Sequence, residues 1–319
     1  MLRRLLTMGR PTGPGRHPSS PFTRELGDHR LQYEPGGPTL VVSFDNAARP
    51  AEEAYVGRPT WGARFYLSEG HSLLGVIARE TSWYRDRTLI AALETLRDEG
   101  FFASFARVVL TGGSMGGFAA AAFAPLAPGA TVIAFSPQST LDGRVVPWER
   151  RYANGRARDW SLPYSDGPAG LAQAAQGFVF FDNFDRADLR HAARFEQTGR
   201  VMLMPVPAGG HGVPPMLIQT GLLKPLTRQI IDGSFSKPAF QKAIRARKET
   251  IRYHRMLARE ALMRRRPGLA LRVCEAGLKR FPLSDLLETR SLALAAMDRP
   301  QQALAALDRA RALRDKRRG

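Results

Sequence analysis

The sequence predicts an α/β fold with a mainly parallel sheet and helices on both faces, followed by a small all-α segment. Short apolar runs alternate with helix-type segments from about residue 39 to residue 231, which is the pattern of a parallel sheet. The segment from residue 237 onward is helical in pattern and differs in composition. At 319 residues, the chain is long enough for one sizeable core and a smaller second unit. We therefore expect a disordered basic arm over residues 1–25, an α/β domain over 26–236 and a helical domain over 237–319.

Runs of Val, Ile, Leu and Phe mark the expected strands, because buried strands of a parallel sheet are apolar on both faces. These strands are expected at residues 40–44, 72–78, 107–111, 131–135, 178–181 and 201–205. Apolar residues at helical spacing, or small apolar residues that suit close packing on a sheet, mark the helices. The helices are expected at residues 87–99, 115–124 and 188–196, and an apolar stretch follows at 214–223.

The segment between the strands at 131–135 and 178–181 breaks this alternation. It is rich in Pro, Gly, Arg and aromatic residues, and long irregular excursions of this kind usually serve function. We expect a lid over about residues 140–176. Its substrate-binding residues are predicted to be Trp148, Arg150 and Arg151, because arginine beside aromatic rings suits an anionic group or a sugar ring. The alternative is a solvated loop without a binding role.

Two stretches of the helical domain resemble tetratricopeptide repeats. Ala270, Cys274, Gly277 and Pro282 have about the spacing of small, large and closing residues in the second helix of that motif. Ala303 follows Ala270 after 33 residues, close to the 34-residue period of these repeats. The alternative is an amphipathic helical hairpin that only packs against the α/β domain.

Positive charge is concentrated at the C-terminal end of the chain. The formal net charge is +18, and the residues from Lys237 onward hold 22 Lys and Arg against 8 Asp and Glu. Such an excess predicts an acidic partner, which we expect to be a protein rather than nucleic acid, or else a solvated helical surface. Because this segment holds no residue that we assign to chemistry, it is expected to be separable from catalysis.

A turn that resembles the nucleophile elbow of serine hydrolases lies at residues 111–117, with the sequence TGGSMGG. The run RVVLT precedes it and the small-residue helix MGGFAAAAFA follows it, which is the strand–turn–helix setting that the G-x-S-x-G motif requires. A phosphate-binding glycine loop is the competing interpretation, but the Lys and Thr of that pattern do not follow. The sequence therefore predicts Ser114 as a nucleophile.

The serine hydroxyl needs a neighbouring base, and His211 has the best position among the six histidines. It follows the strand expected at 201–205 and lies in a loop, AGGHG, whose glycines allow the ring to reach over a sheet edge. The third member is expected between serine and histidine in the chain. We assign Asp185 to this role ahead of Asp182, which adjoins the preceding strand, and ahead of Asp188, which is expected to cap the next helix.

Acyl transfer also requires donors for the developing oxyanion. One donor is expected to be the backbone N–H of Met115, the residue after the nucleophile. The second is expected from the backbone that follows the strand at 40–44, at Asp45 or Asn46, and we take Asn46.

These motifs together resemble the α/β-hydrolase superfamily. The segments LVVSFDN, TGGSMGG, FVFFDNFD and AGGHG occur in the order and spacing of that superfamily, across residues 38–232. The resemblance implies a mostly parallel sheet of eight strands and hydrolysis by a Ser-His-acid triad through an acyl-enzyme. Residues 132–139 are also similar to hydrolase-like domains found beside bacterial surface-polysaccharide enzymes, which favours acylated sugars as substrates.

The sequence therefore predicts an esterase, deacylase or acyltransferase that acts on a small-molecule or glycan ester. The alternative is a non-catalytic hydrolase-fold scaffold whose basic helical tail binds a protein or another acidic partner. No metal-ligand cluster or nucleotide fingerprint is present, so no cofactor and no metal are expected. The single cysteine, the lack of an apolar run of about 18 residues and the lack of a secretory leader pattern predict a cytoplasmic protein without a transmembrane segment.

Overall fold

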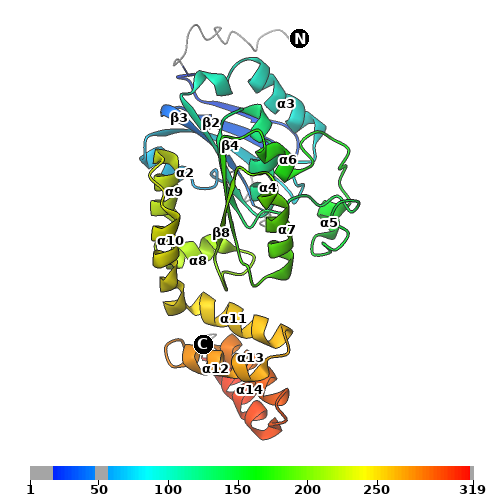
Figure 1. Ribbon diagram of the computed structural model, residues 1–319, viewed down its shortest axis with the longest axis vertical. Helices are drawn as coiled ribbons and strands as arrows, with labels where there is room; N and C mark the ends of the chain where they lie inside the picture. Colours follow the sequence, from blue (N-terminus) through cyan, green and yellow to red (C-terminus); the bar gives the residue numbers. More distant parts are fainter. Residues whose placement is uncertain (1–16, 47–56, 317–319) are drawn as a thin grey trace. The chain divides into compact units, whose positions relative to one another are not determined.

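The structure, a computed structural model, describes residues 17–46 and 57–316. Eight strands form one sheet in the order β1-β2-β4-β3-β5-β6-β7-β8 (Figure 1). The strands are β1 (Phe22–Glu25), β2 (His29–Glu34), β3 (Gly37–Phe44), β4 (His71–Ala78), β5 (Arg107–Gly113), β6 (Thr131–Phe135), β7 (Gln176–Phe181) and β8 (Val201–Pro205). The pairs β1–β2 and β2–β4 are antiparallel, and the pairs from β4 through β3, β5 and β6 to β7 are parallel. This mostly parallel sheet with its helices confirms the predicted fold class.

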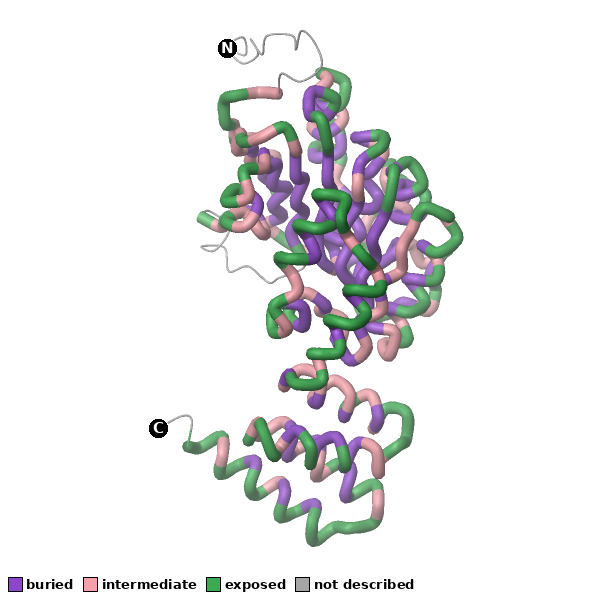
Figure 2. The backbone as a smooth tube through the Cα atoms, turned by 60° about the vertical axis from the view of Figure 1, so that its left-hand side comes forward, coloured by how far each residue is buried: buried purple, intermediate pink, exposed green. Residues whose placement is uncertain are grey.

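Buried apolar residues concentrate in the central strands, which Figure 2 shows as almost continuously buried. The helix α4 packs on β3, β5 and β6, and α2 packs on β4. The helices that accompany the sheet are α2 (Ala63–Ser68), α3 (Arg87–Asp98), α4 (Met115–Ala122), α5 (Ala153–Arg156), α6 (Gly167–Leu171) and α7 (Arg186–Glu196). All six expected strands are present within three residues of their predicted ends.

The two antiparallel strands at the start of the sheet were not predicted. Strand β1 lies inside the arm that was expected to be disordered to residue 25, so that expectation is wrong at residues 22–25. Strand β1 (FTRE) has a single apolar residue, and β2 (HRLQYE) has only Leu31 and Tyr33 at alternate positions. Both signals are therefore weak. The remainder of the predicted arm, residues 1–16, lies outside the described residues.

The chain divides into two compact units. Unit 1 comprises residues 1–180 and 190–204, and unit 2 comprises residues 181–189 and 205–319. The predicted domain boundary between residues 236 and 237 therefore falls inside unit 2. The helices of unit 2 after β8 are α8 (Val213–Gln219), α9 (Leu223–Asp232), α10 (Lys237–Ala243), α11 (Ile251–Met263), α12 (Pro267–Leu278), α13 (Ser284–Ala295) and α14 (Pro300–Asp315). Over the described part of the chain, no helix has the length and apolar character needed to cross a lipid bilayer.

The last four helices, α11 to α14, pack on one another through small residues. Ala270 and Cys274 on α12 are fully buried, and Ala303 on α14 belongs to the same kind of alanine-rich core. A Cβ added at Gly277 would lie within about 3 Å of His254 and Leu286, so glycine allows these helices to approach closely. The small residues of the repeat-like pattern, Ala270, Gly277 and Ala303, therefore face the core between these helices.

The segment predicted as a lid is tied down by a buried arginine. The guanidinium of Arg85 donates to the carbonyl oxygens of four residues and lies 5.3 Å from the ring centroid of buried Trp160. Its four acceptors are Asp159, Leu162, Pro163 and Tyr164. This part of the segment is therefore held by hydrogen bonds from the α/β core and is not a solvated loop.

Arg85→Met is expected to lower the free energy of unfolding by about 3 kcal/mol or more, because each lost hydrogen bond from a charged donor contributes about 1.5–3 kcal/mol. It should also expose residues 159–164 to limited proteolysis. Arg87→Met is the control, because the Arg87 side chain is 78% exposed and makes one surface ion pair with Asp159. Equal urea midpoints and equal cleavage patterns in the two variants would contradict the role of Arg85.

Candidate active site

Ser114 occupies a strained turn between β5 and α4. Its backbone angles are φ 53° and ψ −114°, a conformation that non-glycine residues rarely adopt. A Cβ at Gly112 would lie 2.4 Å from the carbonyl of Gly116, and a Cβ at Gly116 would lie 2.4 Å from the carbonyl oxygen of Phe44. Only glycine fits at both positions, so the glycines of the motif allow β3, β5 and α4 to meet at this turn.

Gln138 contributes a polar side chain that contacts Ser114 and was not predicted from the sequence. Its Nε2 donates to Ser114 Oγ and to the Tyr152 hydroxyl, each over 3.3 Å. Its Oε1 accepts a hydrogen bond from Trp83 Nε1 over 3.1 Å, which fixes the orientation of the amide because an indole N–H can only donate. Gln138 is fully buried and follows β6 by three residues, so no local pattern distinguishes it.

Unit 1 also contains the backbone groups predicted to bind an oxyanion. Met115 is the first residue of α4, so its N–H has no acceptor within the helix. The N–H of Asp45 donates to the carbonyl of Val76, and its carboxylate pairs with Arg58 over 2.7 Å. Asp45, one of the two residues predicted to supply the second oxyanion donor, therefore already uses its backbone N–H in a hydrogen bond.

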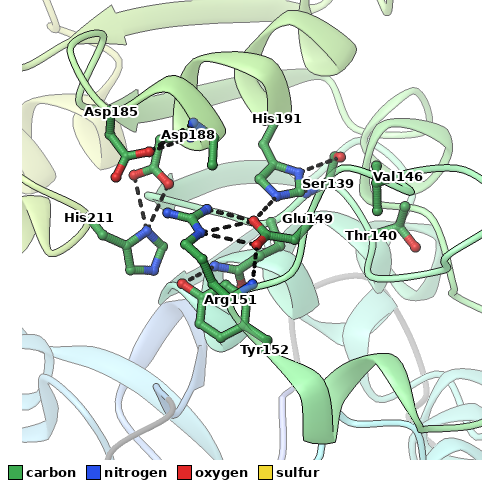
Figure 3. A network of polar contacts seen from close by, with 12 residues as sticks. Ser139, Thr140, Val146, Glu149, Arg151, Tyr152, Asp185, Asp188, His191 and His211 are labelled. Carbon is green, nitrogen blue, oxygen red and sulfur yellow. Dashed lines mark hydrogen bonds and ion pairs between the residues drawn. The ribbon is translucent and has the colours of Figure 1, made fainter. Parts of the chain in front are cut away.

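In unit 2, His211 pairs with Asp188 (Figure 3). The Nδ1 of His211 lies 2.8 Å and 3.0 Å from the two carboxylate oxygens of Asp188, which is almost completely buried. A carboxylate at this distance fixes Nδ1 as the protonated nitrogen and leaves the lone pair on Nε2. This is the orientation that a general base of a triad requires.

Asp185 and Asp188 have exchanged the positions expected from the sequence. Asp185 was predicted to face His211, but its carboxylate accepts hydrogen bonds from the N–H groups of Ala187 and Asp188 at the start of α7. It therefore has the N-cap position that was predicted for Asp188. The reason is helical geometry: Asp188 lies in the first turn of α7, on the side where its carboxylate reaches His211.

Asp182 joins the loop after β7 to the loop that carries His211. Its carboxylate accepts hydrogen bonds from the backbone N–H groups of Phe184, Ala208 and Gly210 over 2.8–3.0 Å. Burial raises the pKa of Asp182 to about 6, although these three hydrogen bonds favour the ionised form. Asp182 therefore fixes backbone on both sides of the His211–Asp188 pair.

The predicted substrate-binding residues Trp148, Arg150 and Arg151 have different surroundings. The Trp148 ring lies 4.6 Å from the His191 ring, and the Arg190 guanidinium lies over it at 4.1 Å. Arg151 forms a two-pronged ion pair with Glu149, whereas Arg150 is exposed. Two of the three side chains are therefore engaged with other residues of unit 1.

A buried pair, His191 and Glu149, anchors this segment to α7 and was not predicted (Figure 3). The N–H of Ser139 donates to His191 Nδ1, so His191 carries its proton on Nε2 and donates it to Glu149. Burial alone would raise the pKa of Glu149, but the hydrogen bonds from His191 and Arg151 outweigh it and lower the pKa to about 2. Glu149 is therefore a fully buried carboxylate that stays ionised at neutral pH.

Several solved structures resemble this chain at low sequence identity. A capsule O-acetyltransferase of Neisseria meningitidis serogroup A is 16% identical, with a TM-score of 0.44, over 66% of this chain and 94% of that one. Fluorophosphonate-binding serine hydrolase F of Staphylococcus aureus is 12% identical, with a TM-score of 0.40, over 60% and 91%. Carboxyl esterase 2 of the fungus Tuber melanosporum is 12% identical, with a TM-score of 0.42, over 75% and 89%. No protein-family model matches the sequence, and no curated protein matches it.

The raised pKa of Asp182 predicts how stability depends on pH. Because the folded protein holds this proton up to about pH 6 and an unfolded carboxyl only to about 3.8, stability should fall by about 3 kcal/mol between pH 4 and 7. Asp182→Asn should remove this part of the dependence, measured by urea unfolding at several pH values. Asp185→Asn is the control and should keep it. Parallel curves for wild type and Asp182→Asn would contradict the assignment.

Proposed function

We propose that the chain is a serine hydrolase in which Ser114 is the nucleophile, His211 the general base and Asp188 the acid. The strained conformation of Ser114 between β5 and α4 carries this proposal, because such a turn is the setting in which a serine hydroxyl is presented for attack. The His211–Asp188 pair supports it, since the pair leaves Nε2 of the imidazole as an acceptor. Each of the three residues follows a strand of the sheet: β5, β7 or β8.

The reaction proceeds in two steps. Nε2 of His211 accepts the proton of Ser114 Oγ as this oxygen attacks the ester carbonyl, and the imidazolium then protonates the departing alcohol. Asp188 holds the ring and stabilises the imidazolium without taking the proton. Water or a sugar hydroxyl then attacks the acyl-enzyme and gives its proton to Nε2. The bond between the acyl carbon and Oγ breaks, and Ser114 Oγ takes the proton back from the imidazolium.

The negative charge that develops on the carbonyl oxygen is stabilised by backbone N–H groups. Met115 supplies one of them from the first turn of α4. We propose the backbone N–H of Asn46, which follows β3, as the other donor. Gln138 donates to Ser114 Oγ in the resting enzyme and so orients the hydroxyl before attack.

The proposed substrates are esters of small molecules or acylated sugars, with Trp148, Arg150 and Arg151 near the bound substrate. The sugar preference rests on the sequence of residues 132–139. For the C-terminal helices we propose a tetratricopeptide-like arrangement that binds an acidic protein. Its support is the excess of positive charge and the exposed Met263, Leu292 and Leu304.

Ser114→Ala is expected to abolish labelling by a fluorophosphonate probe and to lower ester hydrolysis by about 10⁴-fold, because the nucleophilic oxygen is removed. Ser139→Ala is the matched control: its hydroxyl lies 2.9 Å from the His191 ring, but both side chains are fully buried. Labelling that persists in Ser114→Ala would overturn the nucleophile. A wild-type chain that does not react at all would favour the non-catalytic scaffold.

Asp188→Asn is expected to lower kcat by about 10³- to 10⁴-fold with a small change in KM, because the amide no longer fixes the tautomer of His211. Asp185→Asn should cost far less, since Asn also caps helices well. Steady-state kinetics on a chromogenic ester compares the two variants. A larger loss in Asp185→Asn would return the acid role to Asp185.

A further inference from the structure

The loop that carries His211 is held by a hydrogen bond from α11. Arg252, the second residue of α11, donates from Nε to the carbonyl oxygen of Gly209 over 2.6 Å. Its side chain is only partly accessible to solvent. A guanidinium that donates to a carbonyl at this distance makes a strong, directional hydrogen bond. This contact lies within unit 2 and two residues from His211.

The glycines on either side of His211 make room for α11. A Cβ at Gly210 would lie 3.3 Å from Arg252 Nη2 and 2.8 Å from the sulfur of Met256, and a Cβ at Gly212 would lie 3.1 Å from the same Nη2. Gly210 also has a φ of +68°, which a side chain would strain. The sequence around His211 is therefore fitted to close contact with Arg252.

Two further arginines of unit 2 hold the neighbouring backbone. Arg247 donates to the carbonyl of Pro207 over 3.0 Å, at the start of the His211 loop. Arg264, just after α11, donates to the carbonyl of Phe184 over 2.9 Å and lies over its ring, in the loop between β7 and α7. The loops that lead to both members of the His–Asp pair are therefore attached to the segment around α11.

We propose that Arg252 is a positioning residue for His211, so that the C-terminal helices contribute to catalysis rather than forming a separable domain. This inference rests on the proposed function. The physical reason is that a glycine-rich loop has no regular secondary structure to hold it, while α11 is a regular helix that packs through Ala258 into the helical core with Cys274. A displacement of about 1 Å at a catalytic group can cost about 100-fold in rate.

The test uses the full chain and compares Arg252→Met with Arg259→Met, a control on an exposed position of the same helix. Arg252→Met is expected to lower kcat about 10- to 100-fold on a chromogenic ester with little change in KM, whereas the control keeps both. Arg252→Lys should recover part of the loss, because an ammonium group can still donate to the Gly209 carbonyl. If Arg252→Met does not fold, Arg252→Gln takes its place in the same comparison.

A double-mutant cycle separates positioning from general destabilisation. Combined with His211→Ala, the Arg252 substitution should have no further effect on the rate of fluorophosphonate labelling, because it acts through His211. Additive losses, or full activity of the Arg252 variants, would overturn the inference while leaving Ser114 and His211 as assigned. Failure of the proposed function has a different signature, since the wild type would then not be labelled at all, or Ser114→Ala would still be labelled.

Discussion

The turn between β5 and α4 depends on the absence of side chains at Gly112 and Gly116. Each glycine lies against backbone atoms, so a methyl group at either position would force the strand and the helix apart. That closeness presses Ser114 into its strained φ and ψ and brings the start of α4 against the end of β3. The conformation of the proposed nucleophile and the position of the first N–H groups of α4 both depend on this close approach.

A second constraint holds the loops after β7 and β8. The Asp182 carboxylate accepts hydrogen bonds from backbone N–H groups of both loops. Arginines on and beside α11 donate to carbonyl oxygens of the same loops, and the bond from Arg252 to Gly209 is the shortest of these. Charged side chains thus satisfy the backbone donors and acceptors of these irregular loops. Burying the charges costs desolvation free energy, but the hydrogen bonds fix the conformation of a loop that is rich in glycine. The His211–Asp188 pair lies within this framework.

In unit 1, too, buried charged side chains hold irregular backbone in place. The buried carboxylate of Glu149 accepts hydrogen bonds from His191 and Arg151, and these contacts keep it ionised. Arg85 makes four bonds to carbonyl oxygens around Trp160. Since removing one partner of a buried charged contact leaves the other unsatisfied, these groups specify one arrangement of the segment over residues 140–176. The segment predicted from its composition as a lid is therefore built as a structured part of unit 1.

Local patterns were sufficient for the parallel strands, for the turn at Ser114 and for the position of His211 after β8. Apolar runs and glycine spacing report directly on backbone conformation, and neighbours in the sequence carry that information. The strands β1 and β2 were not predicted because they are short and contain few apolar residues. The choice of Asp188 over Asp185, the contact of Gln138 with Ser114 and the attachment of α11 through Arg252 were decided only by the tertiary structure. These contacts join residues 23 to 43 positions apart, and the reach of a side chain across such distances depends on helix phase and packing, which no local pattern records.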